Sequence, residues 1–315
     1  MRKFIYNTLI FLFILSILVF TGLFLPATPR ISNSLFFAEN NKDLQLSKVS
    51  RPRIIFIGGS NLSFGLNSQM IKDSLKLNPI NTGLHQGIGL EYMLDHYLNK
   101  IKSGDIVVVS PEYHQFYDKN SYGGEELLPM VFDVTSFNLN KIKFKQWQNI
   151  YKFIPSYSLS KFLPFEYYGF TKSNIYSVYS FNEFGDVFTH WKLSNQKITA
   201  VNAVGENFNF SIITDLKKFQ KNVLERGALL YITFPGFQAT SFEKCKNQIK
   251  QIEHQLKING FTILGTPEKY KIPDDMMFDT IYHLSKKGVD FRTNLLILDI
   301  RNANNLNFKK SNYLI

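Results

Sequence analysis

A short apolar run in the first quarter of the chain, Ile54–Ile57, ends at two glycines followed by a serine. Four consecutive β-branched or aromatic residues are typical of a strand covered on both faces, as in parallel sheets flanked by helices. Gly58 and Gly59 permit a sharp turn that a side chain would obstruct. The pattern therefore predicts that Ser60 lies at the carboxyl edge of a parallel sheet, where open α/β folds bind their ligands.

Similar apolar segments recur along the chain, and helical patterns separate them. We expect strands at about 53–57, in a short segment ending at Asn81, and at about 106–109, 229–234 and 261–264. Helical periodicity begins near Ser68 and near Ser285, and also covers about 89–101, 212–223 and 241–258. Alternating strands and helices predict an α/β fold with three layers, α/β/α, around a mostly parallel five-stranded sheet.

The alternation stops between about residues 115 and 205. This segment is rich in Phe, Tyr, Asn, Ser and Lys, and a structureless loop of that length inside a compact domain would be unusual. We therefore expect an inserted, aromatic-rich subdomain that covers one edge of the site. Its aromatic rings can stack on sugars, but we favour a role in the core of the insert, because aromatic residues dominate burial. These residues include Trp147, Tyr167, Tyr168, Phe170, Tyr176, Tyr179 and Trp191.

The N-terminus has the pattern of a membrane anchor. Arg2 and Lys3 precede Ile5–Leu25, an apolar run about as long as the ~20 residues that cross a bilayer as a helix. A cleaved signal peptide is the alternative, but the run is longer than a typical signal core and no clear small-x-small site follows it. We expect an uncleaved transmembrane anchor over residues 1–30, a polar stalk over 31–50, and a domain over 51–315 outside the cytoplasm.

Composition limits the partners and the chemistry. The formal net charge is +11 and 44% of the residues are apolar, so the chain can bury a sizeable core and favours anionic surroundings. The basic residues form no continuous stripe, and we expect no nucleic-acid partner. A single cysteine, Cys245, excludes an internal disulfide. Metal-ligand spacing is absent among His85, His96, His114, His190 and His254, so we expect neither a metal nor a cofactor.

A candidate base for Ser60 lies near the other end of the chain. Asp279 and His283 are four residues apart, and one turn can bring the carboxylate to the imidazole. In a serine triad the histidine takes the serine proton, while the aspartate fixes the histidine tautomer and stabilises the imidazolium. Ser60, Asp279 and His283 are therefore our candidate catalytic residues.

Taken together, three segments resemble the motifs of the SGNH/GDSL hydrolase family, in its membrane-anchored, acyltransferase-like branch linked to bacterial surface glycans. The segments are Gly58–Asn61 with Phe64–Ser68, Asn81–Gly83 with Gly87, and Asp279–Leu284 with Gly288 and Arg292–Thr293. The resemblance covers roughly residues 51–115 and 211–300. It implies that the N–H groups of Ser60 and Gly83 face a developing oxyanion.

The chain departs from this family in two places. The family has a Gly-x-Asn-Asp motif after the third strand, whereas here the strand leads into Pro111-Glu112-Tyr113. The third oxyanion donor is therefore unassigned, and Asn61 is our candidate for it. The Asp–His spacing is four residues here and three in the family. We expect Glu112, Tyr113 and His85 to contact substrate, because all three follow predicted strands.

The resemblance implies a serine-dependent O-acyltransferase or esterase, most simply for acetyl groups, that acts on an extracytoplasmic polysaccharide. The domain would then lie in the bacterial periplasm or at the cell surface. The implied partners are the lipid bilayer, the glycan substrate and an integral-membrane protein that supplies the acyl group. A non-catalytic glycan-binding or assembly protein that retains the fold is the alternative. A lipolytic esterase is a third possibility, but it would require an apolar acyl groove.

Overall fold

The computed structural model describes residues 1–135, 139, 142–202 and 204–312. Its centre is a five-stranded parallel sheet in the order β2-β1-β3-β4-β6. The strands are β1 (Arg53–Gly58), β2 (Asn78–Asn81), β3 (Ile106–Ser110), β4 (Leu229–Thr233) and β6 (Ile263–Leu264). The predicted α/β class with a parallel five-stranded sheet is confirmed.

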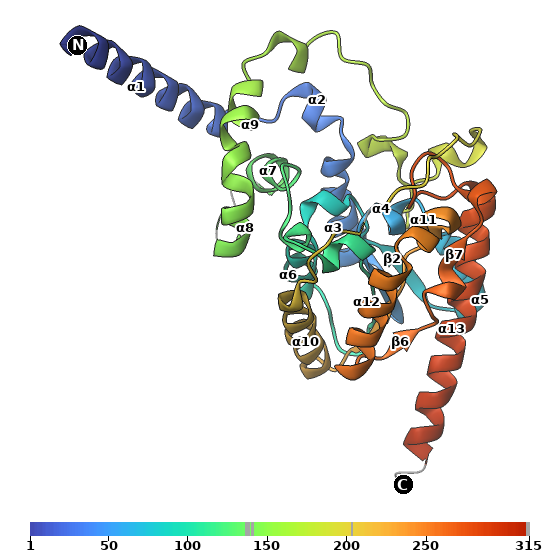
Figure 1. Cartoon of the computed structure of the whole chain (residues 1–315). Helices are drawn as coiled ribbons and strands as arrows, with labels where there is room; N and C mark the ends of the chain where they lie inside the picture. The colour runs from blue at the N-terminus through green and yellow to red at the C-terminus, as the bar shows by residue number, and fades with distance from the viewer. Residues whose placement is uncertain (136–138, 140–141, 203, 313–315) are drawn as a thin grey trace.

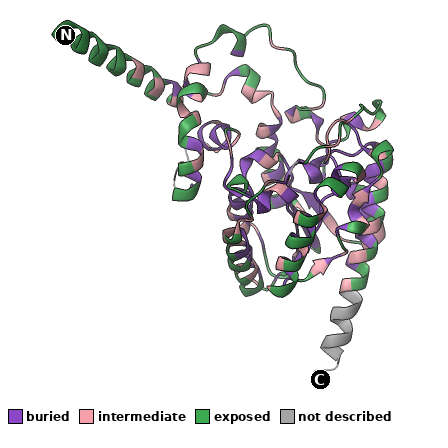
Figure 2. Ribbon diagram, viewed as in Figure 1, coloured by how far each residue is buried: buried purple, intermediate pink, exposed green. Residues whose placement is uncertain are grey.

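Helices cover both faces of this sheet (Figure 1). The main ones are α5 (Ser68–Leu75), α6 (Leu90–Leu98), α10 (Phe210–Glu225), α12 (Lys246–Ile258) and α13 (Lys286–Asn312). Helix α6 packs with α10 on one face, and α5 packs with α13 on the other. The strands are buried between them (Figure 2), and β1 is buried along its whole length. The apolar run of β1 therefore has the two-sided burial that its composition predicts.

Local signals set the helix boundaries. The Asn67 side chain accepts a hydrogen bond from Met70 N at 3.3 Å and so caps α5. Gly227, with φ +72°, follows α10 in a conformation that favours glycine. The predicted helix over 241–258 is broken, however. Helix α11 (Ala239–Lys244) ends at the buried Cys245, whose φ of −107° interrupts the helix before α12 begins.

Residues 31–50, for which we expected a polar stalk, contain short helices. This segment contains α2 (Pro29–Ser32), η1 (Leu35–Phe37) and α3 (Ala38–Lys48). Ala38, Lys42 and Leu46 lie four residues apart and form a buried stripe on α3. The Lys42 ammonium donates to Asn81 O at 2.8 Å and to Gly185 O at 2.5 Å. The segment is therefore packed against the end of β2.

The segment from 115 to 205 is made of short helices and turns. It includes η4 (Asn120–Tyr122), α7 (Leu127–Pro129), η5 (Met130–Val134), α8 (Phe144–Ile150), η7 (Tyr151–Phe153), α9 (Ile154–Ser160), η8 (Pro164–Glu166), η9 (Val178–Ser180) and η10 (Thr189–Lys192). Trp147 packs edge-on against Phe132. Tyr168 and Tyr179 are instead 79% and 76% exposed. The aromatic residues therefore serve both the interior and the surface of the insert.

The remaining elements are short and connect the larger ones. They are α4 (Ser60–Ser63), η2 (Gln86–Ile88), η3 (Tyr113–Phe116), η11 (Glu268–Tyr270), η12 (Asp274–Met276), and a two-stranded parallel sheet of β5 (Phe237–Gln238) and β7 (Lys271–Ile272).

Helix α1 (Arg2–Phe24) projects from the domain (Figure 1). Within the helical region Arg2–Ser32, an 18-residue window has a mean hydropathy of 2.7, so the helix is long and apolar enough to cross a membrane; a signal sequence would have the same properties.

Candidate active site

Ser60 lies where the sequence predicts, directly after β1 and at the first position of α4. A side chain at Gly59 would place its Cβ 2.7 Å from Glu112 Oε1, so glycine allows the loop to approach this carboxylate. The Ser60 hydroxyl donates to Glu112 Oε1 at 3.3 Å. Within the described part of the chain, no hydrogen bond joins Ser60 to His283. The nucleophile candidate is thus held by a carboxylate in this structure.

The loop that carries Ser60 is fixed by a buried arginine from the last helix. Arg292 of α13 is fully buried. It donates to Asn61 O at 2.7 Å and to Asn61 Oδ1 at 3.2 Å. It also donates to the Ser110 hydroxyl at the end of β3, at 3.1 Å. Burial lowers the pKa of Arg292 to about 10. Arg292 therefore links the end of the chain to the ends of β1 and β3.

The candidate base comes from the loop before α13. His283 Nδ1 lies 2.8 Å from Asp279 Oδ1, and a carboxylate acceptor fixes the proton on Nδ1 and leaves Nε2 for substrate chemistry. The His283 ring stacks on Phe64, with 4.0 Å between ring centroids. Leu284 N donates to Phe64 O at 3.2 Å. The base loop is therefore attached to the loop that carries Ser60.

Tyr176, from the insert, completes this arrangement. Its hydroxyl donates to Asp279 Oδ2 and lies 3.2 Å from His283 Nδ1. Burial alone would raise the pKa of Asp279, but the hydrogen bond and charge of His283, together with the Tyr176 hydroxyl, lower it below its ordinary value. The sequence gives no signal for this role, since Tyr176 is 103 residues from Asp279. An aromatic-rich insert supplies many tyrosines, and spacing does not single out this one.

Ser60 and His283 line the same cavity, which has a volume of about 470 Å³. Ligand sites commonly fall between roughly 300 and 1,000 Å³. The other lining residues are His85, Gln86, Glu112, His114, Asn120, Thr280, Ile281 and Tyr282. Burial lowers the pKa of His85 and of His114, so both imidazoles favour the neutral form. The wall is therefore rich in neutral hydrogen-bonding groups.

The hydrogen bonds to the cavity histidines define their orientation. Gly87 N donates to His85 Nδ1 at 3.1 Å, which places the proton of a neutral His85 on Nε2. His114 Nε2 pairs with the Gln86 side-chain oxygen. Glu112 and His85, which we expect to contact substrate, lie in the cavity wall, together with His114 and Gln86. Tyr113 does not line the cavity: it is fully buried, and its ring packs edge-on against Phe237.

The three candidate oxyanion donors differ in availability. Ser60 N–H has no acceptor among the described residues. Gly83 N–H donates to Asn81 Oδ1 at 3.0 Å. The Asn61 side-chain amide donates to Ser110 O at 3.1 Å and approaches Glu112 at 3.4 Å. In this structure only the Ser60 donor is free, and the Gly83 and Asn61 groups are already hydrogen-bonded within the protein.

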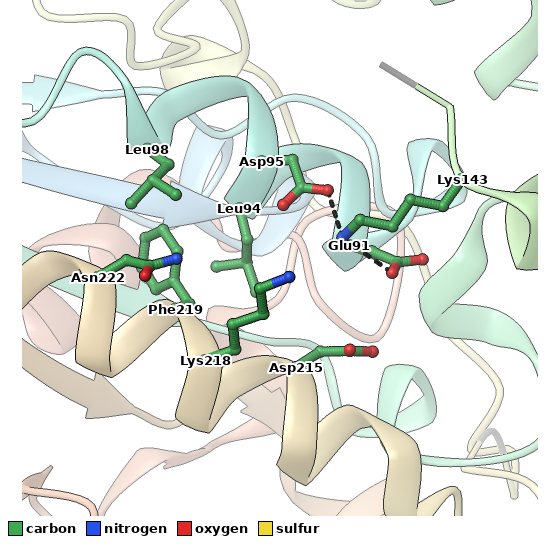
Figure 3. A pocket seen from close by; sticks show the side chains of 9 residues that line it. All are labelled: Glu91, Leu94, Asp95, Leu98, Lys143, Asp215, Lys218, Phe219 and Asn222. Carbon is green, nitrogen blue, oxygen red and sulfur yellow. Dashed lines mark ion pairs between the residues drawn. The ribbon is translucent and has the colours of Figure 1, made fainter. Parts of the chain in front are cut away.

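A second hollow lies between α6 and α10 (Figure 3). Its volume is about 20 Å³, which is room for about one water molecule. Lys143 pairs there with Glu91 at 3.1 Å and with Asp95 at 2.5 Å. Ion pairs fill this hollow, and it is too small for a substrate. In the described part of the chain, no group of three or more His, Cys, Asp or Glu residues could hold a metal ion.

Comparison with known proteins adds no assignment: no protein-family model matches this chain, and no curated protein is significantly similar to it. The structure defines an α/β protein whose sheet edge carries a serine, a histidine–aspartate pair and a polar cavity.

Proposed function

We propose that this protein is a membrane-anchored, serine-dependent O-acyltransferase or esterase that acts on an extracytoplasmic glycan. One observation carries the proposal: Ser60, which follows the first strand, and His283, which follows the last, form walls of one cavity. The His283–Asp279 pair supports it, because a serine triad needs a base whose second nitrogen is held by a carboxylate. The resemblance to the SGNH/GDSL family supplies the reaction class.

The proposed reaction has two steps. Ser60 Oγ attacks the carbonyl carbon of an ester, and its proton passes to His283 Nε2 as the tetrahedral oxyanion forms. The oxyanion collapses, the bond to the leaving oxygen breaks, and that oxygen takes the proton from His283. A glycan hydroxyl or water then gives its proton to His283 and attacks the carbonyl carbon of the Ser60 ester. The bond to Ser60 Oγ breaks, and Ser60 Oγ takes the proton back from His283. A glycan acceptor makes the protein a transferase, and water makes it an esterase.

Before the reaction, the Ser60 hydroxyl is hydrogen-bonded to Glu112. For the first step the hydroxyl must turn from Glu112 Oε1 toward His283, and the Ser60 N–H then faces the oxyanion. This bond also favours the rival function, a non-catalytic glycan-binding or assembly protein, because a serine held by a carboxylate is not held by its base. The two functions differ in whether Ser60 becomes acylated.

Substrate class follows from the cavity wall and the anchor. The wall carries His85, Gln86, His114, Asn120 and Thr280, side chains that suit a hydroxyl-rich acceptor better than an acyl chain. A transmembrane α1 with its basic end in the cytoplasm places the domain outside the cytoplasm, in the periplasm or at the cell surface. Acetyl as the acyl group, and a membrane protein as its donor, rest on the family resemblance.

Acylation of Ser60 is tested with the full chain in detergent and a fluorophosphonate probe. We expect the native chain to label, and Ser60→Ala and His283→Ala to lose about a hundredfold or more of the labelling rate. Ser63→Ala, a buried serine of the same loop, and His254→Ala, an exposed histidine, are the controls and should label normally. A native chain that never labels, with unchanged glycan acylation in a Ser60→Ala strain, would favour the assembly role.

Glycan analysis separates the two enzymatic outcomes. In a strain that carries Ser60→Ala, glycan acylation should fall if the protein is a transferase and rise if it is an esterase.

A further inference from the structure

The insert is packed against the outer end of α1. Helix α9 lies along the last turns of α1. The Ser158 hydroxyl donates to Val19 O, and a Cβ at Gly22 would lie 2.4 Å from Ser158 O. Lys161 Nζ donates to Leu25 O at 2.9 Å. These contacts follow the α1 backbone from Val19 to its end.

The length of α1 fixes the depth of these contacts. The apolar run Ile5–Leu25 contains 21 residues, and about 20 helical residues are needed to cross the hydrocarbon core of a bilayer. A membrane-spanning α1 therefore has almost no apolar length to spare. Val19 lies about 9 Å along the helix from Leu25, at 1.5 Å per residue. Helix α9 must then contact the outer ~9 Å of the hydrocarbon layer, and Lys161, which contacts Leu25, lies at its boundary with the headgroups.

The chain that follows α9 begins beside Leu25, at the end of α1, and exposes apolar side chains there. Within residues 162–169 every side chain but that of Glu166 is exposed. Phe162 is 43% exposed, Leu163 52%, Phe165 50% and Tyr168 79%. Four large apolar or aromatic residues so close together are unusual on a surface that faces water. Aromatic residues are enriched at the interface of a bilayer, where one end of the ring contacts hydrocarbon and the other contacts the hydrated headgroups.

Positively charged side chains lie next to aromatic rings around this segment, as is common at the surface of a bilayer. The Arg30 guanidinium lies 4.4 Å from the centroid of the Phe165 ring and pairs with Glu166 at 2.8 Å. Lys161 is buried and pairs with Asp133 at 2.7 Å, so its charge is neutralised where the chain leaves α1. Lys152 lies over the Phe153 ring, 4.9 Å from its centroid, with its own side chain exposed. Cations next to aromatic rings suit the phosphates of lipid headgroups.

We infer that residues 162–169 form an interfacial segment that inserts its aromatic side chains into the headgroup region of the bilayer in which α1 is anchored. The occupant of this surface is lipid, and the surface is continuous with the membrane-spanning helix. The inference rests on the proposed membrane anchor and is independent of the serine chemistry. Membrane contact by residues 162–169 would set the height and the tilt of the domain relative to the bilayer, because the insert then contacts the membrane at a second place besides α1.

Depth-dependent fluorescence quenching tests this inference. The full chain is reconstituted into vesicles of phosphatidylcholine and phosphatidylglycerol, with an NBD label on a single introduced cysteine. Tyr168→Cys and Phe165→Cys report on the segment, and both positions are exposed, so the fold should tolerate the label. Ile258→Cys, 61% exposed on α12 away from α1, is the control, and Ile14→Cys reports on α1 itself. Cys245 is wholly buried, and the unsubstituted chain gives its background.

Lipids with a nitroxide on the headgroup should quench the labels at 168 and 165 at least twofold more than the label at 258. Lipids with a nitroxide deep in the acyl chain should quench the label at 14. Quenching at 168 and 165 no greater than at 258, with the label at 14 quenched, overturns the inference and leaves the anchor intact. Protection of 168 and 165 that occurs only in native membranes would also overturn it and would assign the surface to a protein partner.

Discussion

At the scale of single residues, Asp279 accepts hydrogen bonds on both carboxylate oxygens. His283 uses one oxygen and Tyr176 the other. Hydrogen bonds to the ionised form lower the pKa of Asp279, against the effect of burial. The folded pKa of Asp279 therefore lies below its unfolded pKa, and the stabilisation is present above the unfolded pKa and is lost as the pH falls through the folded one.

Tyr176→Phe removes one of these bonds and leaves the ring in place. We expect the rate of Ser60 labelling to fall about tenfold, since a hydrogen bond to a charged group contributes roughly 1.5 kcal/mol. The pKa of Asp279 should rise, so the acid limb of the labelling rate should move to higher pH. The measurement is the labelling rate against pH for both chains.

Tyr179→Phe is the matched control, because Tyr179 lies in the same insert and is 76% exposed. It should keep both the native rate and the native acid limb. A Tyr176→Phe chain with a lower rate but an unmoved acid limb would show that Tyr176 only supports the fold of the insert.

Residues that adjoin an apolar strand or share one turn could be predicted from sequence. Ser60 follows a run whose burial is evident, and Asp279 and His283 are four residues apart. Tyr176 and Arg292 act on residues more than 100 positions away. No local pattern encodes such pairs. The bond from Ser60 to Glu112 likewise depends on the two strands lying side by side.

At the scale of elements, α3 shows where periodicity misleads. Its buried stripe consists of Ala38, Lys42 and Leu46. Because lysine is rarely buried, a lysine in this position indicates from sequence that the helix face is exposed to solvent. Strands β1, β3 and β4 lie within one residue of the ranges expected from sequence, because their central residues form apolar runs. The small sheet of β5 and β7 was not predicted, since strands of two residues carry no period.

Lys42 makes α3 sensitive to pH. Burial lowers the pKa of Lys42 to about 7, from an ordinary value of 10.5, although Asp186 and Glu39 oppose this. Between these values the unfolded chain binds more protons than the folded one, so the free energy of unfolding rises with pH. The cost of burying the charged form is several kcal/mol, at about 1.4 kcal/mol per pKa unit, and is fully present below pH 7.

Lys42→Met should remove this dependence. We expect the thermal midpoint of the native chain in detergent to rise between pH 7 and 9, and that of Lys42→Met to be flatter. Lys48→Met, on the exposed side of the same helix, should keep the native slope. Equal slopes in Lys42→Met and the native chain would mean that Lys42 titrates normally.

At the scale of the whole molecule, the insert joins the apolar helix α1 to the candidate site. Helix α9 contacts α1 near Gly22, and Tyr176 of the same insert contacts Asp279. Sequence could predict a long apolar helix at α1 from its composition, and a break in the strand–helix alternation between about residues 115 and 205. It could not predict that α1 and this segment touch, because the contact between Gly22 and Ser158 depends on a close approach of two backbones.

Gly22→Leu tests whether this contact holds the insert. A Cβ at Gly22 would lie 2.3 Å from Ser158 Oγ, so a leucine there must displace α9. Helix α1 itself should not weaken, because leucine favours a helix more than glycine does. We expect amide hydrogen exchange in residues 154–169 to become about tenfold faster, equivalent to about 1.4 kcal/mol of easier local opening. The rate of Ser60 labelling should fall by a smaller factor, about two- to threefold, since Tyr176 is also held by its own hydrogen bonds to Asp279 and Ser173.

Thr21→Leu is the matched control, because Thr21 precedes Gly22 on α1 and its side chain is exposed. It adds the same side chain to α1 without meeting α9, and exchange in residues 154–169 should stay at the native rate. If both variants exchange at the native rate, α9 is held by contacts other than the one with Gly22. If both exchange faster, the effect comes from a bulkier α1 in the bilayer. The contact between Gly22 and Ser158 is supported only if exchange is faster in Gly22→Leu and native in Thr21→Leu. In that case a movement of α1 shifts the insert, and with it Tyr176 and its hydrogen bond to Asp279.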